Sequence, residues 1–291
     1  LTAQRRRETV AKLITRHGVS ERRACRVVGQ PRATQRYRRK LHDRDTALRR
    51  RLVELAGKHP RYSYRRMTAL LRGEGWAVNP KRIYRLWRAE GLRVPQRRRD
   101  WRAPGEAKNG CHEHPAKGPN DVWAYDFLSD QTVDGRTLRV LAVVDEYTRR
   151  ALALVPARRF PGTKVVDVLA DLVHRHGAPR AIRSDNGPEL VSKAVRGYLE
   201  SLDIGALFVA PGAPWQNGYA ETFNARFRDE LLDRELLGNL VEARVVLEAY
   251  RREYNDERPH STLGYLTPNE YTRRCWESAQ ARNNPHPPGL S

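Results

Sequence analysis

Three carboxylates in different local settings have the chemistry of a metal centre. Asp126 lies in an apolar run that predicts a β-strand, and Asp185 follows the short, mostly apolar stretch of residues 181–184. Glu221 lies one turn into a predicted helix that opens at Asn217, and 35 residues separate it from Asp185. A strand, a strand end and a helix can bring three side chains to one point, where carboxylate oxygens would hold divalent metals. Two metals held together activate water or a hydroxyl group against a phosphodiester.

The local context of these acids is more specific than their spacing, because the chain holds 34 Asp and Glu residues. Asp185 stands at a strand end with Gly187 behind it, and open α/β sheets bind their ligands at such ends. In the predicted helix, Glu221, Asn224 and Arg228 recur on one face. We therefore expect Glu221 to bind metal while Arg228 reaches a neighbouring phosphate.

Three other acids in the same stretch compete for the metal-binding role. Asp134 stands in a predicted turn, and Asp145 ends a strand and is followed by Glu146, a setting that favours a structural or capping role. Asp130 shares the strand face of Asp126, but four residues at about 3.3 Å each place it about 13 Å away, too far to share the metals. Asp126 is therefore the expected ligand.

The positive charge of the chain is concentrated in its first part. The net charge is +21, and residues 1–110 hold 32 Lys and Arg against 9 Asp and Glu. Residues 111–291 hold 23 against 25 and are close to neutral. A basic arm of this kind favours a nucleic-acid partner, because clustered cations bind phosphates. The alternatives are a basic solvated surface and an RNA-binding protein of the ribosomal type.

The composition excludes a membrane protein and a disulfide framework. Hydrophobic residues make up 39% of the chain, no apolar run approaches the roughly 20 residues of a spanning helix, and the polar start lacks a signal-peptide pattern. Three cysteines without metal or redox spacing fit a reducing cytoplasm. The run Cys111-His112-Glu113-His114 has no matching second half, so we expect no zinc there.

Two short helices with a glycine-containing turn are predicted near the N-terminus, after a basic helix within residues 1–17. Ser20 is a good N-cap for a helix over 21–28, Gly29 ends it, and Pro31 opens a helix over 32–40. This order is a helix-turn-helix pattern, with an ordinary helical hairpin as the alternative. The side chains expected to face DNA are Arg32, Thr34, Gln35, Arg36, Arg38 and Arg39.

A second helical module is expected over residues 42–92. Three helices are indicated by apolar positions with helical spacing: Leu48, Leu52 and Leu55; Met67, Leu70 and Leu71; Ile83, Leu86 and Trp87. The basic residues between them are expected to bind DNA: Arg65, Arg66, Arg72, Lys81, Arg82, Arg85 and Arg88. A Pro/Gly-rich linker over 93–118 follows, in which Arg97, Arg98 and Arg99 would contact the phosphate backbone.

From residue 120 the pattern changes to strands and helices. Strands are predicted over 122–130, 138–144, 151–155, 181–184 and 207–210, with a hairpin turn at Asp134-Gly135. Helices are predicted over 163–176, 188–202, from Asn217 onward, and over 240–256. This order predicts an α/β ribonuclease H-like core, a mixed five-stranded sheet with helices, preceded by all-α helix-turn-helix modules.

The predicted domain organisation has five parts. The segments are 1–41, a helix-turn-helix; 42–92, a second helical DNA-binding domain; 93–118, a basic linker; 119–235, the catalytic core; and 236–291, a helical extension with a tail. The last ~15 residues are rich in Asn and Pro, so we expect them to lack a fixed structure.

Three long runs resemble one protein family. They read SDNGPE over 184–189, PGAPWQNGYAE over 211–221 and YNDERPHSTLGYLTP over 254–268. Together they resemble the catalytic half of bacterial insertion-sequence transposases of the OrfB type, which are related to retroviral integrases. The similarity also includes the helical modules at 20–92. Carried over by position, the acidic (DDE) triad of the family falls on Asp126, Asp185 and Glu221, and its basic residue seven beyond the Glu falls on Arg228.

The resemblance implies a reaction, a cofactor and partners. It implies two Mg²⁺ ions per site, with Mn²⁺ as a substitute, 3′-end nicking of the element, strand transfer by the freed 3′-hydroxyl and a circular intermediate. It also implies a homo-oligomer, at least a dimer on DNA, that binds terminal inverted repeats and target DNA in the bacterial cytoplasm, at the nucleoid. Residues 1–17 show no sustained heptad pattern, so we expect the upstream leucine zipper of the family to be absent.

Several residues in the matching runs have two possible roles. Trp215, Gln216 and Asn217, just before the predicted helix, either touch DNA or order the loop. Tyr254, Arg258 and His260 either contact DNA or hold the C-terminal segment against the core, and a structural role is favoured for Tyr254. Two alternatives to a transposase also stay open: a nuclease of ribonuclease H type that only hydrolyses DNA, and a non-catalytic DNA-binding regulator.

Overall fold

The structure, a computed structural model, describes residues 2–37, 43–95, 114–185, 187, 192–209 and 217–283. The chain divides into two compact units, residues 1–54 and 55–291, and each is described by itself.

The first unit is a small helical assembly. Its helices are α1 (Ala3–His17), α2 (Glu21–Val28) and α3 (Arg32–Arg36), followed by the start of α4 (Asp43–Lys58). The Ser20 hydroxyl caps α2 by accepting from the Arg23 N–H, and Gly18 and Gly29 end α1 and α2 in the left-handed conformation that glycine adopts without strain. The helix predicted over 32–40 is wrong in length, because α3 ends at Arg36; residues 38–42 lie outside the described part.

The second unit begins with helices that match the predicted module. These are the end of α4, α5 (Tyr64–Gly73) and α6 (Pro80–Ala89). The Asn79 side chain caps α6 by accepting from the Lys81 N–H, and Pro80 occupies the first helical position. The apolar residues of the predicted stripes are buried, among them Met67 and Ile83.

A five-stranded sheet forms the centre of the second unit. The strands are β1 (Val122–Gln131), β2 (Thr137–Asp145), β3 (Ala151–Ala157), β4 (Ala181–Ser184) and β5 (Gly205–Phe208). Their order is β3-β2-β1-β4-β5; β1, β2 and β3 pair antiparallel, and β4 and β5 extend the sheet in parallel with β1. The predicted mixed sheet of a ribonuclease H-like core is confirmed.

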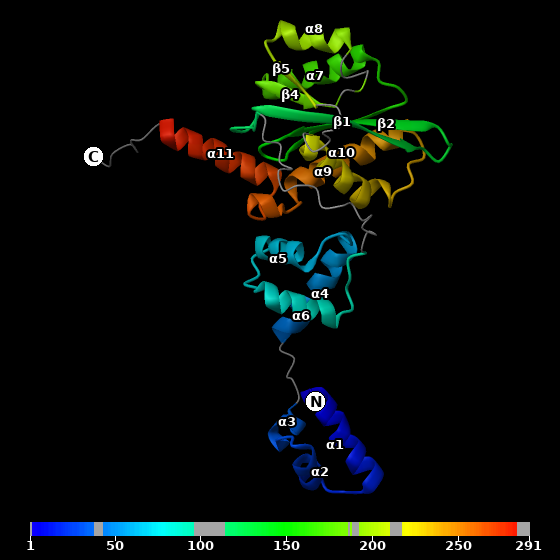
Figure 1. Cartoon of the computed structure of the whole chain (residues 1–291), viewed down its shortest axis with the longest axis vertical. Helices are drawn as coiled ribbons and strands as arrows, with labels where there is room; N and C mark the ends of the chain where they lie inside the picture. Colours follow the sequence, from blue (N-terminus) through cyan, green and yellow to red (C-terminus); the bar gives the residue numbers. More distant parts are fainter. Residues whose placement is uncertain are drawn as a thin grey trace, which may run out of the picture. The chain divides into compact units, whose positions relative to one another are not determined.

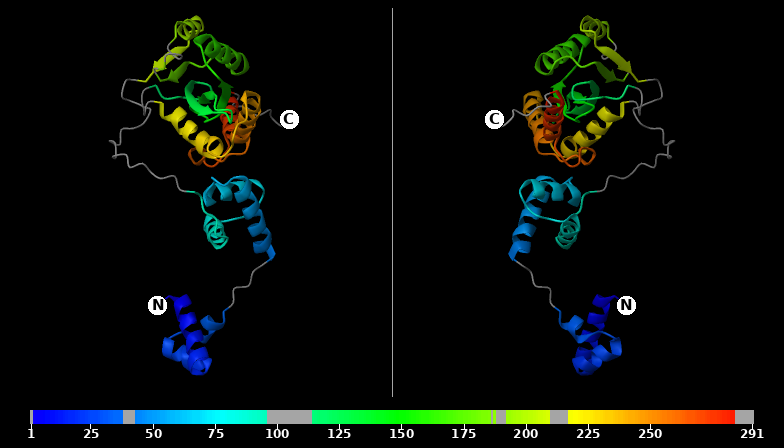
Figure 2. Two further views of the ribbon diagram at one scale, coloured as in Figure 1. Left: turned by 90° about the vertical axis from the view of Figure 1, so that its right-hand side faces the viewer. Right: turned by 90° about the vertical axis from the view of Figure 1, so that its left-hand side faces the viewer.

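Helices cover both faces of this sheet (Figure 1). The helices of the core are α7 (Gly162–His176), α8 (Lys193–Ser201), α9 (Gly218–Phe227), α10 (Leu240–Asp256) and α11 (Pro268–Asn283). The side views of Figure 2 place the green α7 and yellow-green α8 on the opposite side of the strands from the yellow α9 and orange α10. The sheet therefore has two buried faces and two apolar cores.

Alternation along β1 decides which core each side chain enters. Trp123 and Tyr125 are buried in the core with α7 and α8, whereas Ala124 and Leu128 are buried in the core with α9 and α10. Successive side chains of a strand point to opposite faces. The even-numbered residues of β1 therefore face α9, and Asp126 is one of them.

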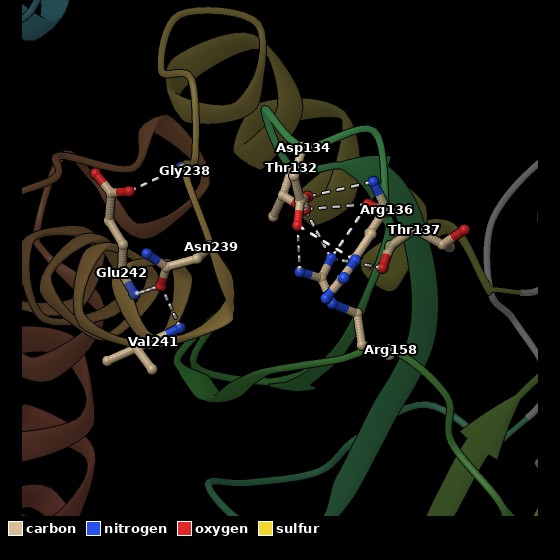
Figure 3. Close-up of polar contacts among 9 residues, drawn as sticks. All are labelled: Thr132, Asp134, Arg136, Thr137, Arg158, Gly238, Asn239, Val241 and Glu242. Atoms are coloured by element: carbon tan, nitrogen blue, oxygen red, sulfur yellow. Dashed lines mark hydrogen bonds and ion pairs between the residues drawn. The ribbon is translucent and has the colours of Figure 1, made fainter.

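The β1–β2 hairpin is closed by contacts from the end of β3. The Arg158 guanidinium donates to the Thr132 hydroxyl at 2.7 Å. It also reaches the carbonyls of Arg136 and Thr137 at 3.1 and 3.0 Å (Figure 3). Gly135 has a φ of 73° in this turn, as the Asp134-Gly135 pair predicts.

The start of α10 is fixed by a cap on the neighbouring segment. The Asn239 side chain accepts from the N–H groups of Val241 and Glu242 at 2.9 and 3.0 Å, and the Glu242 carboxylate accepts from the Gly238 N–H at 2.7 Å (Figure 3). Such reciprocal contacts satisfy the free N–H groups of the first turn. The predicted helix over 240–256 is confirmed.

Two predictions about helices are wrong in their bounds. The helix predicted over 188–202 begins only at Lys193, because the Ser192 hydroxyl caps it by accepting from the Val195 N–H; residues 188–191 lie outside the described part. The last ~15 residues were expected to lack structure, but α11 continues to Asn283. Residues 284–291 lie outside the described part.

A buried ion pair holds the segment that follows α9. The chain continues from α9 into a π-helical turn over Arg228–Leu232, which places Glu230 in the interior. Glu230 and Arg258 are 8% and 2% exposed, and two hydrogen bonds of 2.6 and 2.7 Å join them. Tyr250 lies 3.4 Å from the same carboxylate, and the Tyr254 ring lies 5.1 Å from the Arg258 guanidinium. Arg258 and Tyr254 therefore have the structural role.

Replacing Arg258 with Met should destabilise the protein strongly. The Glu230 carboxylate would stay buried without its main partner, which costs roughly 3–5 kcal/mol of unfolding free energy. Arg252→Met is the matched control, since Arg252 is 72% exposed in its side chain and pairs with Glu248 at the surface, where such pairs contribute about 0–1 kcal/mol. Urea unfolding measures both variants, and equal losses would contradict a special role for the buried pair.

Candidate active site

The sheet brings two of the three predicted carboxylates to one level. In the parallel pair of β1 and β4, Ala124 lies opposite Arg183. Two residues further along, Asp126 lies within β1 and Asp185 is the first residue after β4. Neighbouring strands lie about 4.8 Å apart, and residues two apart share a face. Asp126 and Asp185 therefore stand side by side, on the face of the sheet that α9 covers.

Helix α9 supplies the third carboxylate and an amide. Glu221 is exposed in the first turn of α9, and Asn224 lies one turn further along and is buried. The Asn224 Nδ2 group donates to Asp126 Oδ2 at 2.8 Å, which ties α9 directly to β1. The other oxygen of Asp126 accepts from the Phe127 N–H at 2.7 Å. Asp126 is thus held in one orientation.

Asp126 interacts electrostatically with the other two acids. Burial raises the pKa of Asp126 to about 6, and the negative charges of Asp185 and Glu221 raise it further, while the Phe127 and Asn224 hydrogen bonds oppose the rise. Like charges act this way only at short range. Asp185 is exposed, and its Oδ1 accepts from the Gly187 N–H at 3.0 Å. A strand, a strand end and a helix meet here.

The donor set at this site suits a hard cation. In the described part of the chain, no group of three or more His, Cys, Asp or Glu side chains lies close enough together to hold a metal ion, and this includes the three carboxylates. Mutual repulsion keeps three carboxylates apart, and a divalent cation would remove that repulsion. The Asn224 Oδ1 atom is buried beside Asp126 and has no hydrogen-bond partner among the described residues. All of these donors are oxygens, which Mg²⁺ prefers.

The other predicted residues near the site have varied surroundings. The Arg228 guanidinium donates to the Ser129 carbonyl at 2.8 Å, so it lies against β1, three residues beyond Asp126. Asn217 is 3% exposed at the N-cap of α9, which favours a structural role over a DNA contact. Trp215 and Gln216 lie outside the described residues.

The neighbouring acids have structural roles, as their context predicts. Asp145 is buried, and its Oδ1 accepts from the N–H groups of Tyr147 and Thr148 at 2.8 Å in the β2–β3 turn. Glu146 forms a buried ion pair with Arg183 at 2.7 Å. These contacts anchor β4 to the end of β2.

The predicted DNA-facing residues of the first unit have contacts of their own. Arg32 and Arg36 are exposed and pair with Glu21 at 3.3 and 2.7 Å. The Thr34 carbonyl accepts from the Arg7 guanidinium at 2.8 Å, and Gln35 donates to the Arg7 carbonyl at 3.4 Å. Gln35 therefore points toward α1. Arg38 and Arg39 lie outside the described residues.

The basic residues of α5 and α6 divide into two groups. Arg65, Lys81 and Arg85 are exposed, and Arg82 is half-buried. Arg66 instead lies 3.3 Å from the buried Glu230 carboxylate, a contact that the sequence did not predict. The spacing of basic residues in a helix does not reveal that one of them meets an acid 164 positions away. Arg97, Arg98 and Arg99 lie outside the described residues.

Family models match both parts of this arrangement. Two models of the integrase core domain match residues 116–214 and 202–268, and together they contain all three carboxylates. A model of an HTH-like domain matches residues 42–100, which include α5 and α6.

Relatives from insertion elements cover most of the chain. It is 39% identical to an uncharacterized 39.2 kDa protein of insertion element IS476 from Xanthomonas euvesicatoria, over 100% of this chain and 83% of that protein. It is 39% identical to an uncharacterized 31.7 kDa protein of IS407 from Burkholderia multivorans, over 90% of this chain and 94% of that one. It is 30% identical to the transposase InsD of IS2 from Escherichia coli, over 81% of this chain and 82% of that one.

The chain therefore belongs to the bacterial insertion-sequence transposases with an integrase core, and it is a DDE-type polynucleotidyl transferase of DNA transposition. None of the helices in the described ranges is long and apolar enough to cross a membrane.

Two solved structures are partly similar. The HTLV-2 integrase catalytic core domain in complex with magnesium aligns with 54% of this chain and 99% of its own, at 17% identity and a TM-score of 0.44. A simian T-cell lymphotropic virus intasome in complex with PP2A regulatory subunit B56 gamma aligns with 82% of this chain and 76% of its own, at 17% identity and a TM-score of 0.48. The strand order, rather than these partial alignments, defines the fold of the core.

Neutralising Asp126 should stabilise the metal-free protein in a pH-dependent way. The folded state raises the pKa of this carboxyl to about 6, so the wild type loses stability as the pH rises from about 4 to 6. Asp126→Asn removes that loss. Because partial exposure screens the charge, we expect a gain of about 1–2 kcal/mol at pH 8 and none at pH 4.

Urea unfolding in a chelator at both pH values measures this gain. Asp130→Asn, on the same strand face, is the control and should change stability at neither pH. An Asp126→Asn gain of the same size at pH 4 and pH 8 would show that the effect is not electrostatic.

Proposed function

We propose that Asp126, Asp185 and Glu221 form the catalytic centre at which this transposase nicks the ends of its element and joins the freed 3′-hydroxyl to DNA. The observation that supports this is the placement of Asp126 on β1, with the Asn224 amide of α9 on its carboxylate and the negative charges of Asp185 and Glu221 acting on it. Two separate phosphoryl transfers can use the same centre, because each needs the same charge stabilisation at phosphorus.

The same three carboxylates would hold two Mg²⁺ ions, with Mn²⁺ as a substitute. Bound divalent cations supply Lewis acidity, which favours deprotonation of the attacking water or hydroxyl and offsets charge on the leaving oxygen. Asp126 must be ionised to bind a cation, and the Asn224 amide favours that state by donating to it. The rigid attachment of β1 to α9 keeps the ligand oxygens in place before DNA arrives.

The two steps differ only in the nucleophile. In nicking, a water oxygen attacks the phosphorus, the bond to the leaving 3′-oxygen breaks, and that oxygen receives a proton. In joining, the 3′-hydroxyl of the element end attacks a phosphorus of the target strand and loses its proton. The bond between that phosphorus and the target 3′-oxygen breaks, and this oxygen takes up a proton and leaves as a new 3′-hydroxyl. Each product is a nucleic acid, so no Tyr or Ser of the chain needs to form a covalent link with DNA.

DNA contacts are proposed for the exposed basic residues of both helical modules. On the described surface these are Arg32, Arg36, Arg65, Lys81 and Arg85. Arg228, in the π-helical turn after α9 and hydrogen-bonded to the Ser129 carbonyl of β1, would contact a phosphate near the reacting one. The proposed substrates are the terminal inverted repeats and target DNA, brought together by at least two copies of the chain, because each end needs its own centre.

Neutralising any one of the three acids should abolish chemistry and spare DNA binding. Asp126→Asn, Asp185→Asn and Glu221→Gln are each expected to lower nicking and joining at least about 10³-fold, because each removes a cation ligand. The matched control is Asp130→Asn, which keeps the same strand face. Gel-based cleavage of end DNA measures the chemistry, and a mobility-shift assay measures DNA binding. Retained cleavage in a variant of any of the three acids would overturn the assignment.

Joining distinguishes a transposase from a nuclease. With precut end DNA and a target plasmid, the protein should produce covalently joined molecules in Mg²⁺. Plasmid hydrolysis without joined product, in the presence of bound end DNA, would instead show a nuclease.

DNA binding should weaken steeply with salt. Each Lys or Arg that contacts a phosphate releases counterions, so the affinity falls by about 10³–10⁵ between 50 and 200 mM salt if six to ten contacts form. Fluorescence anisotropy over that range measures the slope. A salt-independent affinity would exclude the basic modules as the main contact.

A further inference from the structure

A pocket of about 440 Å³ lies beside α9, and none of Asp126, Asp185 and Glu221 lines it. Gly218, Thr222 and Arg226 recur every four residues along α9, and all three line it. At about 100° per residue, Arg226 lies roughly 140° around the helix from Glu221. Helix α9 therefore has two separate flanks: one bears Glu221, and the other lines this pocket.

Arginine side chains give this pocket its character. Arg66, Arg149, Arg226 and Arg258 all line it, from four separate segments of the chain. The Glu230 carboxylate forms an ion pair with Arg258, and it also accepts from the Arg66 guanidinium at 3.3 Å. Arg149 and Arg226 have no carboxylate among their described contacts. The pocket thus keeps a net positive charge after its internal ion pairs are taken into account.

The acid that lines the pocket does not compete for these cations. Among the described lining residues the carboxylate is Asp145, which is buried and turned toward backbone N–H groups of its own turn. Burial also raises the pKa of Asp145. The Asp145 carboxylate therefore accepts from backbone N–H groups rather than from the arginines of the pocket.

Two arginines are placed as anion-binding groups. The Arg149 guanidinium lies 3.9 Å from the centre of the Tyr219 ring, and it donates to the Glu146 carbonyl. Stacking on an aromatic face fixes the plane of a guanidinium while leaving its edge free to donate. Arg226 is exposed one turn beyond Thr222, whose hydroxyl also lines the pocket. Planar guanidinium groups bind phosphate oxygens through paired hydrogen bonds.

The positive charges of the pocket also act on the imidazole of His260. Its ring is buried there, and burial lowers its pKa to about 2, with Arg258, Arg66, Arg149 and Arg226 lowering it in the same direction. Four cations of separate origin thus act on one ring. The imidazole stays neutral and leaves the positive charge to the arginines.

We propose that this arginine pocket binds a backbone phosphate of the DNA strand whose reacting phosphate lies at the carboxylates. The proposal rests on the proposed function, and it adds a second phosphate subsite on the far flank of α9. A helix with its side chains is about 10 Å wide, and successive phosphates of one strand are at least the axial spacing of about 3.4 Å apart. The bound phosphate would therefore lie within about three nucleotides of the reacting one.

The test uses end DNA in which single phosphates are replaced by uncharged methylphosphonates. In the wild type, one replacement, within about three nucleotides of the reacting phosphate, should weaken binding about tenfold. Arg226→Ala should bind unmodified DNA about tenfold more weakly, and that same replacement should then have no further effect. Other positions should keep their wild-type sensitivity. Loss of sensitivity at one position identifies the partner of Arg226.

Three further measurements separate this subsite from a general loss of DNA affinity, from a loss of chemistry and from a site for free anions. Arg244→Ala, an exposed arginine of α10 outside the pocket, should keep the wild-type pattern. Glu221→Gln should also keep it while losing nicking and joining, so a failure of the proposed chemistry and a failure of the subsite give different results. Inorganic phosphate, compared with chloride at equal ionic strength, should change the melting temperature of the wild type and of Arg226→Ala by the same amount.

Two results would overturn the proposal. In one, Arg226→Ala keeps the full wild-type pattern of methylphosphonate sensitivity, which means that Arg226 contacts no particular phosphate. In the other, inorganic phosphate stabilises the wild type but not Arg226→Ala while the methylphosphonate pattern is unchanged, which means that the pocket takes a free anion rather than a strand.

Discussion

The desolvation of Asp126 beside two other acids is the constraint that the core of this protein must satisfy. Burial raises the pKa of Asp126, and the negative charges of Asp185 and Glu221 raise it further. Two contacts hold the arrangement. The parallel pairing of β1 and β4 brings the strand of Asp126 beside the strand that ends just before Asp185, and the Asn224 amide donates to Asp126 and ties it to α9. The ionised Asp126 therefore lowers the stability of the folded state.

Helix α9 can present a charged flank only because its other side is firmly held. Phe223 and Phe227 are buried in the core beneath the sheet. The π-helical turn after them brings Glu230 to Arg258, so the far end of the helix is fixed by a buried ion pair as well as by apolar packing. The family resemblance marks Arg258 and its neighbours in the chain, and the structure gives them this anchoring role. Stability of the fold and placement of Glu221 therefore depend on the same segment.

Much of the core could be predicted because its signals are local. Apolar runs indicated β1 and β2, Ser20 and Gly29 bounded α2, apolar residues at helical spacing indicated α10, and the residue contexts singled out the three acids. The failures concern features that depend on distant partners. The burial of Glu230 requires Arg258, 28 positions away, and the arginine pocket draws on residues from 66 to 262. Residues 277–283 were predicted to belong to the tail because the last ~15 residues are rich in Asn and Pro, yet they continue α11.

The central claim is that the three acids lie close enough to act on one another, and the most direct test is the pKa of Asp126 itself. Carbon-13 NMR of the side-chain carboxyl, in the metal-free protein, should give a value of about 6 in the wild type. It should fall in Asp185→Asn, fall in Glu221→Gln, and fall furthest when both are changed, because each substitution removes a negative charge nearby. A pKa of Asp126 that neither substitution moves would show that the carboxylates do not share a site.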